Sequence, residues 1–353
     1  MRFVPPSSAA ARVDGVMRRP PARVTARLSG EDRLIARYFR PLAKAPGALG
    51  LVDDAALYTP RIGEEIVVTA DALVAGVHFF PDDPADAIAR KALRVNLSDL
   101  AAKGAKPAGF LLSLVLPDRT DESWLRAFAR GLRVDSRAYA CPLLGGDTVR
   151  TPGPLTLSIA ALGTVPRGKM VKRSGARAGD RLFVTGTIGD AALGLLVRCG
   201  DKRLADLPKR WREALQRRYR VPEPRNEIAP ALRAHASAAM DVSDGLAGDL
   251  GKLCHASGVT ADIQVARVPL SLAAKAALSS APDLLATILS GGDDYEVLAA
   301  VPPRNVGAFV AAAAKVRVRV AEIGVVVAGK RPPRIPGQDG RPLTLARLSF
   351  SHF

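Results

Sequence analysis

The sequence contains few cysteines and few aromatic residues. Its 353 residues include three cysteines, Cys141, Cys199 and Cys254, which lie far apart and form no Cys-x-x-Cys pair. This spacing argues against a zinc site and against a disulfide framework, and it fits the reducing conditions of the cytoplasm. Aromatic residues make up 5% of the chain, which favours helices packed on sheets over an aromatic-rich β-sandwich.

Long apolar runs are also missing. No run reaches the roughly 18 residues that a membrane span needs. Prolines interrupt the first 28 residues, which are rich in Arg and Ala and nearly free of acids, so they lack the core of a signal peptide. We therefore expect no membrane partner and a cytoplasmic location, and we interpret residues 1–28 as a disordered basic extension or a mis-assigned start.

Acidic residues are fewer than basic ones. The chain has 51 Lys and Arg against 34 Asp and Glu, a formal net charge of +17. Nucleic-acid binding is one interpretation of this excess. The basic residues are scattered, however, and lack the interleaved aromatics on which single strands stack. We favour a solvated Arg-rich surface and expect no nucleic-acid partner, and a basic RNA-binding protein is the alternative from another functional class.

The length of the chain exceeds one typical core, so two domains are expected. Strand-like apolar runs mix with segments of helical periodicity, which predicts an α+β or α/β fold with mixed sheets flanked by helices. The polar segment 166–180 is the expected connection. It separates an N-terminal α/β domain, residues 29–165, from a C-terminal α/β domain, residues 166–353.

The scarce carboxylates gather in short segments, where aspartates stand beside Gly, Ser or Thr at the ends of apolar runs. Converging carboxylates repel one another unless a cation compensates them. Mg²⁺ does so well because it prefers oxygen ligands. The pattern therefore predicts a site with several Mg²⁺ ions that handles a highly charged phosphate substrate. The segments are Val52–Asp54, Thr69–Asp71, Asn96–Asp99, Gly145–Asp147, Asp241–Gly245 and Ser290–Glu296.

Each segment alone has an ordinary structural explanation. Asp53 and Asp54 suit a surface turn, and Asp244 suits a helix N-cap. Asp99 is more informative, because it lies near the apolar face of a helix expected over 83–104, where an unpaired carboxylate is costly. Asp99 could also be a buried residue that caps a loop.

Taken in order, these segments resemble the thiamine-monophosphate kinases, of the superfamily that includes aminoimidazole ribonucleotide synthetase. The resemblance implies the two-domain fold of that superfamily and ATP-dependent phosphorylation of thiamine monophosphate to the diphosphate. It further implies a homodimer, with dimer contacts and the metal and ATP site in the N-terminal domain. It runs from about Glu31 to Phe353, and its most specific matches are Leu73–Phe79, Val95–Ala102, Lys172–Gly175 and Asp241–Leu246.

The resemblance also assigns roles by motif position, and no residue is expected to act as a general base. Asp241 and Asp244 would instead position the reactants. The residues expected at the metal site are Asp54, Thr69, Asp71, Asp99, Asp147, Asp241 and Asp244. Those expected to contact ATP are Gly146, Asp147, Arg173 and Ser243, and those expected to face thiamine monophosphate are His78, Asp293 and Phe350.

Three positions depart from the family pattern: Val52 stands for a usual Gly, Ala70 for Thr and Asp293 for Glu. The implied chemistry needs no base, because a phosphate monoester has its second pKa near 6 and is mostly ionised at pH 7. Metal ions would offset the repulsion of the two polyanions and align in-line attack. Another ATP-dependent enzyme of the superfamily, such as selenophosphate synthetase or the hydrogenase maturation protein, is the alternative.

Overall fold

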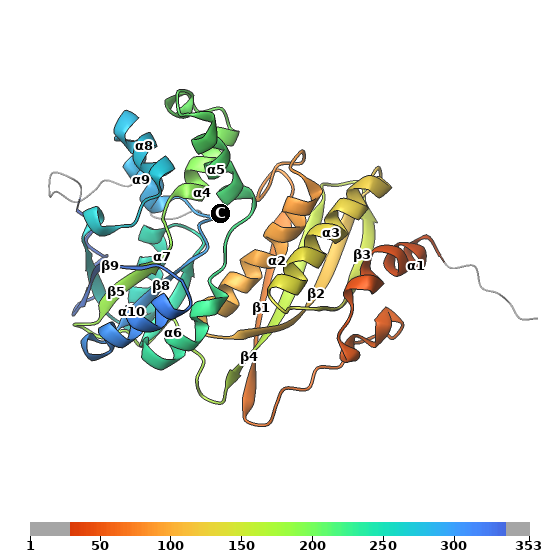
Figure 1. Ribbon diagram of the computed structural model, residues 1–353, viewed down its shortest axis with the longest axis horizontal. Coiled ribbons are helices and arrows are strands. Elements are labelled where there is room, and N and C mark those ends of the chain that lie inside the picture. The colour runs from red at the N-terminus through yellow and green to blue at the C-terminus, as the bar shows by residue number, and fades with distance from the viewer. Residues whose placement is uncertain (1–28, 337–353) are drawn as a thin grey trace, which may run out of the picture.

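The computed structural model describes residues 29–336, which form two domains, each with one sheet (Figure 1). The described chain begins at a capping box. Ser29 Oγ accepts a hydrogen bond from the backbone N–H of Asp32, and the carboxylate of Asp32 accepts one from the N–H of Ser29, each at 3.0 Å. These caps satisfy backbone donors that a helix start leaves unpaired. The segment that follows comprises α1 (Gly30–Leu34), a π-helix (Ile35–Phe39) and 3-10 turns (Arg40–Leu42 and Pro46–Leu51).

The N-terminal domain contains a mixed sheet in the order β1-β4-β2-β3. β2 and β3 are parallel, whereas β1 and β2 each pair antiparallel with β4. β1 and β3 therefore form the two edges of the sheet. The strands are β1 (Glu64–Val74), β2 (Lys106–Pro117), β3 (Leu143–Thr151) and β4 (Thr156–Pro166).

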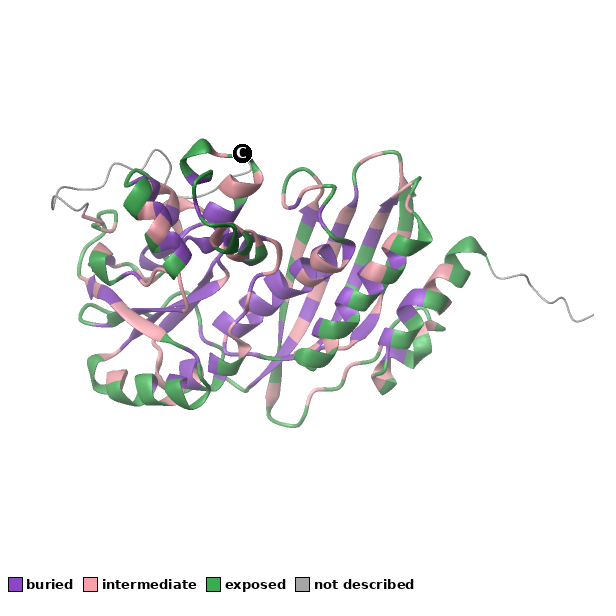
Figure 2. Ribbon diagram, turned by 45° about the horizontal axis from the view of Figure 1, so that its top comes forward, coloured by how far each residue is buried: buried purple, intermediate pink, exposed green. Residues whose placement is uncertain are grey.

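Two helices, α2 (Ala85–Ala102) and α3 (Glu122–Ala138), cover one face of this sheet. Asp121 caps α3 by accepting a hydrogen bond from the N–H of Trp124 at 2.7 Å. α3 exposes its outer side, whereas α2 is buried over most of its length (Figure 2). The reason is that α2 also contacts β6, β8 and α5 of the C-terminal domain, so it lies between the two domains.

The C-terminal domain has a second sheet in the order β6-β8-β5-β9-β7, in which every neighbouring pair is antiparallel. Successive residues of β8 pack in different cores, since Leu298 and Ala300 join one apolar cluster and Val297 and Ala299 join another. Helices therefore cover both faces of the sheet. The strands are β5 (Arg181–Thr185), β6 (Ala238–Val242), β7 (Thr260–Ile263), β8 (Glu296–Val301) and β9 (Val320–Val327).

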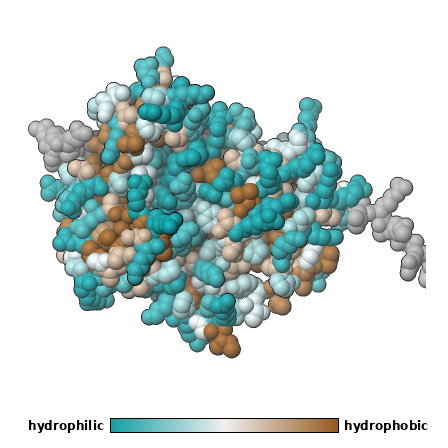
Figure 3. Space-filling view, viewed as in Figure 1, coloured by the Kyte–Doolittle hydropathy of each residue, from teal (hydrophilic) through white to brown (hydrophobic). Residues whose placement is uncertain are grey.

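The helices of this domain divide between the two faces of its sheet. α6 and α10 contribute to one apolar cluster, and α4, α7, α8 and α9 contribute to the other. On the face shown in Figure 3, hydrophobic side chains gather over α10, where Val310 is 41% exposed. The helices are α4 (Asp190–Arg198), α5 (Lys209–Arg220), α6 (Ala229–His235), α7 (Leu246–Ser257), α8 (Leu272–Ser280), α9 (Leu284–Ser290) and α10 (Val306–Lys315).

The expected fold class is confirmed, because two domains with mixed sheets and flanking helices are present. The first sheet ends at Pro166 and the second begins at Arg181, and we keep the domain boundary after residue 165 as a proposal. No helix within 29–336 is both long and apolar enough to cross a membrane. The interpretation of residues 1–28 and the role of Phe350 concern positions outside the described residues.

Candidate active site

A cavity of about 550 Å³ lies between the two domains. We call it the inter-domain cavity. The N-terminal domain contributes β1, the turn after it and α2, and the C-terminal domain contributes α4, α5, the turn after β6 and the loop before β8. Many of the residues expected at the metal, ATP and acceptor sites line it: Asp71, His78, Asp99, Asp241, Ser243, Asp244 and Asp293.

Asp71 and Asp99 approach each other because of their places on β1 and α2. Side chains of Thr69 and Asp71 point from β1 toward α2, since alternate residues share a face of a strand. Thr69 Oγ1 donates a hydrogen bond to Asp99 Oδ2 at 2.5 Å. Burial, together with the neighbouring carboxylates of Asp99 and Asp244, raises the pKa of Asp71 to about 6. Among the described residues, the charged groups that act on Asp71 are thus carboxylates.

Asp241 lies at the end of β6, and it joins the two domains. Ser98 Oγ, on α2, donates a hydrogen bond to Asp241 Oδ2 at 3.0 Å. Burial raises the pKa of Asp241 well above its usual value, the neighbouring Asp99 and Asp249 add to this, and Lys103 offsets it only in part. A second buried carboxylate is therefore short of compensating charge on the opposite wall of the cavity.

Asp244 is not the N-cap of α7, so the ordinary explanation for this aspartate is wrong. Gly245 occupies the cap position with φ of 110°, and a Cβ there would lie 2.5 Å from the carbonyl of Ser290. The side chain of Asp244 instead accepts a hydrogen bond from Lys252 Nζ at 2.5 Å. Its backbone N–H donates to Asp249 Oδ2 at 2.9 Å. These contacts hold the Asp244 turn beside the cavity.

The loop before β8 carries Asp293 into the cavity in a strained conformation. Asp293 has φ of 72° and Tyr295 has φ of 51°, values that cost roughly 1–2 kcal/mol each for residues with a side chain. Their backbone N–H groups donate to the carbonyls of Ser243 and Val242, both at 2.8 Å. Gly292 allows this close approach, because a Cβ there would lie 2.4 Å from the Ser243 carbonyl. Strain of this kind often marks a functional position.

His78 lies in the turn that follows β1. Its Nδ1 accepts a hydrogen bond from the N–H of Val74 at 3.0 Å, so a neutral ring carries its proton on Nε2. Lys91 Nζ donates to the carbonyl of His78 at 2.8 Å and to Asp293 Oδ2 at 3.0 Å. The two residues expected at the substrate are thereby linked through one lysine.

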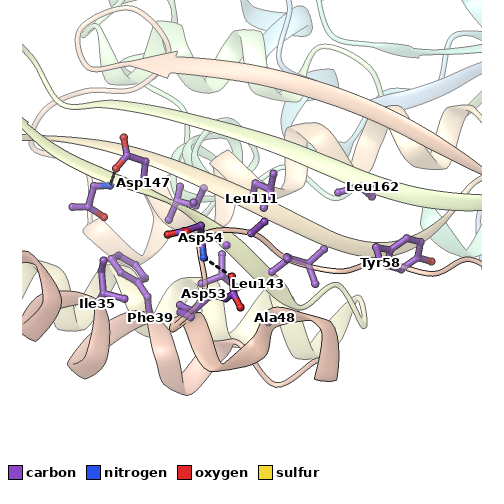
Figure 4. Close-up of a pocket in the computed structure, with 18 residues that line it drawn as sticks. Ile35, Phe39, Ala48, Asp53, Asp54, Tyr58, Leu111, Leu143, Asp147 and Leu162 are labelled. Atoms are coloured by element: carbon purple, nitrogen blue, oxygen red, sulfur yellow. Dashed lines mark hydrogen bonds between the residues drawn. The ribbon is translucent and has the colours of Figure 1, made fainter. Parts of the chain in front are cut away.

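Four other expected residues line different cavities of the described chain. Asp54, Gly146 and Asp147 line a second cavity of about 550 Å³ beside β3 (Figure 4). Asp71 and Gly146 belong to one row across the sheet, through Ile159 and Leu112. Three strand spacings of about 4.8 Å place them about 14 Å apart. Arg173 lines a third cavity with Lys252 and His255.

The carboxylates of the inter-domain cavity suit Mg²⁺ chemically but are not gathered into a finished metal site. Within residues 29–336, no three Asp, Glu, His or Cys side chains lie close enough together to hold a metal ion. The donors around the cavity are nevertheless carboxylate and hydroxyl oxygens, which hard cations prefer. Burial first, and neighbouring carboxylates second, raise the pKa of Asp71 and of Asp241, and a bound cation would offset both effects.

Sequence reasoning missed three functional candidates, namely Lys91, Tyr219 and Lys252. Lys91 does carry a signal, because it lies on the same helical face as Ile88 and Val95, where a lysine is unexpected. Tyr219 and Lys252 carry no such signal. Tyr219 contacts Lys91 on the distant helix α2, and Lys252 contacts Asp244 in the turn before its own helix.

Comparison with known proteins identifies the family. Models described as AIR synthase related protein match twice, the N-terminal domain at residues 52–165 and the C-terminal domain at 177–334. A thiamine-monophosphate kinase from Caulobacter vibrioides is 46% identical over 322 residues, which cover 90% of this chain and 89% of that protein. The chain belongs to the thiamine-monophosphate kinase family. The expectation of a phosphotransferase is thus confirmed.

Solved structures of thiamine-monophosphate kinases support the same conclusion. The crystal structure from Stenotrophomonas maltophilia K279a has a TM-score of 0.77 and 39% identity, and the match covers 88% of this chain and 96% of that one. A structure described as AaThiL complexed with AMPPCP and TMP has a TM-score of 0.73 and 30% identity, with 85% and 91% covered. Both matches include the two domains that enclose the inter-domain cavity.

Proposed function

We propose that the protein transfers the γ-phosphoryl group of ATP to the phosphate of thiamine monophosphate in the inter-domain cavity. The observation that carries this proposal is the convergence of Asp71, Asp99 and Asp241, from both domains, on one cavity. The relative described as complexed with AMPPCP, a methylene analogue of ATP, and TMP supports the choice of substrates.

The two ends of the cavity differ in chemistry. Asp71, Asp99 and Asp241 make one end acidic, and Lys103 compensates their charge only in part. At the other end Asp293 is paired with Lys91, beside His78. We assign the acidic end to the polyphosphate with its cations, and the His78 and Asp293 end to the acceptor. The contribution of Phe350 to the acceptor end stays a prediction.

Direct in-line transfer is the mechanism we propose. When bound, Mg²⁺ supplies charge compensation and alignment of the two phosphates. Its protein ligands would be Asp71, Asp99, Asp241 and Asp244, with Thr69 orienting Asp99 through its hydroxyl. Asp241 and Asp244 position the reactants, and no side chain has to remove a proton from an acceptor that is already ionised.

We further propose a homodimer built on the free face of the first sheet. Alternation along the strands leaves large apolar side chains exposed on the face opposite α2 and α3, a pattern typical of an interaction surface. They are Ile66 at 42%, Val68 at 64%, Leu111 at 39% and Val149 at 44% exposure. Pairing of two such sheets can bring the β3 edge of one protomer, with Gly146 and Asp147, beside the β1 edge of its partner.

The experiment that tests the proposed function measures product formation with separate acceptors. We expect thiamine diphosphate from thiamine monophosphate and ATP, no product without Mg²⁺, and no phosphorylation of thiamine. Thiamine should fail because its neutral alcohol needs a general base, and the proposed mechanism assigns that role to no residue. Comparable formation of the monophosphate from thiamine would contradict the proposal.

A further inference from the structure

Lys91 is a buried cation on the wall of the inter-domain cavity. Its side chain, on α2, is 2% exposed. Its ammonium group donates to the carbonyl of His78 at 2.8 Å and to Asp293 Oδ2 at 3.0 Å. The nitrogen also lies 4.0 Å from the ring centroid of Tyr219. All four residues line the cavity.

These contacts compensate the burial of the ammonium group. A buried charge is costly unless it is paired and hydrogen-bonded, and Lys91 has a carboxylate, a carbonyl and an aromatic face around it. The partners come from both sides of the cavity, since His78 follows β1 whereas Tyr219 lies on α5 and Asp293 precedes β8. Lys91 therefore connects the two domains at the acceptor end.

The ion pair with Lys91 also holds Asp293, whose backbone adopts a left-handed conformation. Asp293 has φ of 72°, a left-handed value that few residues with a side chain adopt. Its backbone is held by the carbonyl of Ser243, and its side chain is held by Lys91 through one carboxylate oxygen, Oδ2. The side chain is still 29% exposed, so the rest of the carboxylate reaches the cavity.

We propose that Lys91 is a positioning residue for the acceptor, which fixes Asp293 and the His78 turn in the orientation that receives it. This inference rests on the proposed function and goes beyond it, because it gives the lysine a specific effect on acceptor binding. Lys91 touches neither reacting phosphate in this scheme and acts through Asp293 and His78. The polyphosphate end, formed by Asp71, Asp99 and Asp241, does not depend on it.

The test compares Lys91→Met, which keeps the length of the side chain and removes its charge, with wild type. We expect the KM for thiamine monophosphate to rise tenfold or more, while the KM for ATP stays within about twofold. Calorimetric titration with thiamine monophosphate should show a parallel loss of affinity. Lys106→Met, at an exposed lysine of β2, is the matched control and should change neither constant.

A double variant separates positioning from a general role in stability. Asp293 is the charged partner through which most of the effect of Lys91 is expected, so Lys91→Met combined with Asp293→Asn should raise the acceptor KM no more than about twofold above the value for Asp293→Asn alone. Coupled residues show such non-additivity, whereas independent ones add. Additive losses, or equal rises in both KM values, would overturn the inference.

Lys91→Arg serves if the methionine variant does not fold. A planar guanidinium keeps the charge but cannot reproduce both hydrogen bonds of the compact ammonium group. We expect a selective rise of about threefold or more in the acceptor KM, and an unchanged value would overturn the inference. A wild-type protein without turnover would overturn the proposed function and this inference together, whereas normal wild-type turnover with an unchanged acceptor KM in the variants overturns this inference alone.

Discussion

Asp71 and Asp241 sit on opposite walls of the inter-domain cavity, and each carries a raised pKa because burial and neighbouring carboxylates disfavour its charged form. A fold gains nothing from such residues when no cation is bound. A ligand that brings positive charge explains their presence. Two predictions follow from these carboxylates.

Replacement of Asp99 by Asn should lower turnover about 100-fold or more while the fold stays intact. The amide keeps the hydrogen bond from Thr69 but loses the charge that binds Mg²⁺. The measurement is kcat at saturating substrates, with thermal unfolding as the check on folding. Asp118→Asn, at an exposed position, is the control and should behave as wild type. Near-normal turnover of Asp99→Asn at limiting Mg²⁺ would remove Asp99 from the site.

Without Mg²⁺, Asp71 should contribute a loss of stability as the pH rises from about 4 to 7. The folded pKa of Asp71 is raised to about 6, so the folded state holds a proton that the unfolded chain, with a pKa near 3.9, has released. The stabilisation is therefore complete below pH 4 and is lost as the pH passes through 6. Urea unfolding in EDTA should show this slope, and it should be flatter in Asp71→Asn. An identical slope in both proteins would contradict the assignment.

The elements differ in how far local sequence determines them. The capping box at Ser29 and the periodicity of α2 are local signals, and α2 forms within the helix expected over 83–104. β3 was not anticipated as a strand, since its Gly145-Gly146 pair suits a turn, and its hydrogen bonds come from β2, which is distant in the chain. α5 has a weak apolar pattern because one of its inward residues, Arg218, is charged.

Local sequence likewise indicates some residues of the candidate site and not others. The aspartates of the inter-domain cavity could be found from short motifs, because those motifs lie at the ends of strands and helices. The contact of Lys91 with Asp293 could not, because the two residues are 202 positions apart and meet only when the domains pack. The separation of Asp147 from Asp71 likewise depends on the strand order, which no local pattern specifies.

α5 is held to β8 by a buried ion cluster, and this predicts a stability effect. Glu296 is fully buried and pairs with Arg218 at 2.9 Å and Arg225 at 2.5 Å. Glu296→Gln leaves two guanidinium groups short of a carboxylate and should cost about 3 kcal/mol of unfolding free energy. The control Glu322→Gln affects a half-buried residue with longer ion pairs and should cost about 1 kcal/mol or less. Equal losses in urea unfolding would contradict this account.

For the whole molecule, the separation of Asp71 and Asp147 at opposite edges of one sheet raises the question of how both could serve one site. A dimer that joins the β3 edge of one protomer to the β1 edge of its partner answers it, because each site would then use residues of both chains. Symmetry would give two equivalent sites of this kind. The arrangement can be tested without a structure of the dimer.

Mixing Asp71→Asn and Asp147→Asn proteins, each inactive alone, should restore about a quarter of wild-type activity after subunit exchange. Half of the dimers are then mixed, and each mixed dimer keeps one site in which both aspartates are intact. The measurement is turnover before and after exchange, with light scattering to establish the dimer. Mixtures that remain inactive, although exchange is shown, would place both aspartates in a site within one chain.

One helix, α2, carries residues of both the acceptor end and the phosphate end of the cavity. Lys91 serves the acceptor end, and Asp99, eight residues later, serves the phosphate end. At 1.5 Å per residue the helix separates them by about 12 Å. A helix buried on nearly all sides cannot shorten or bend to suit another molecule. The fixed distance between Lys91 and Asp99 should therefore select acceptors by length. Compounds with a longer or shorter arm between ring and phosphate should bind without presenting that phosphate for attack.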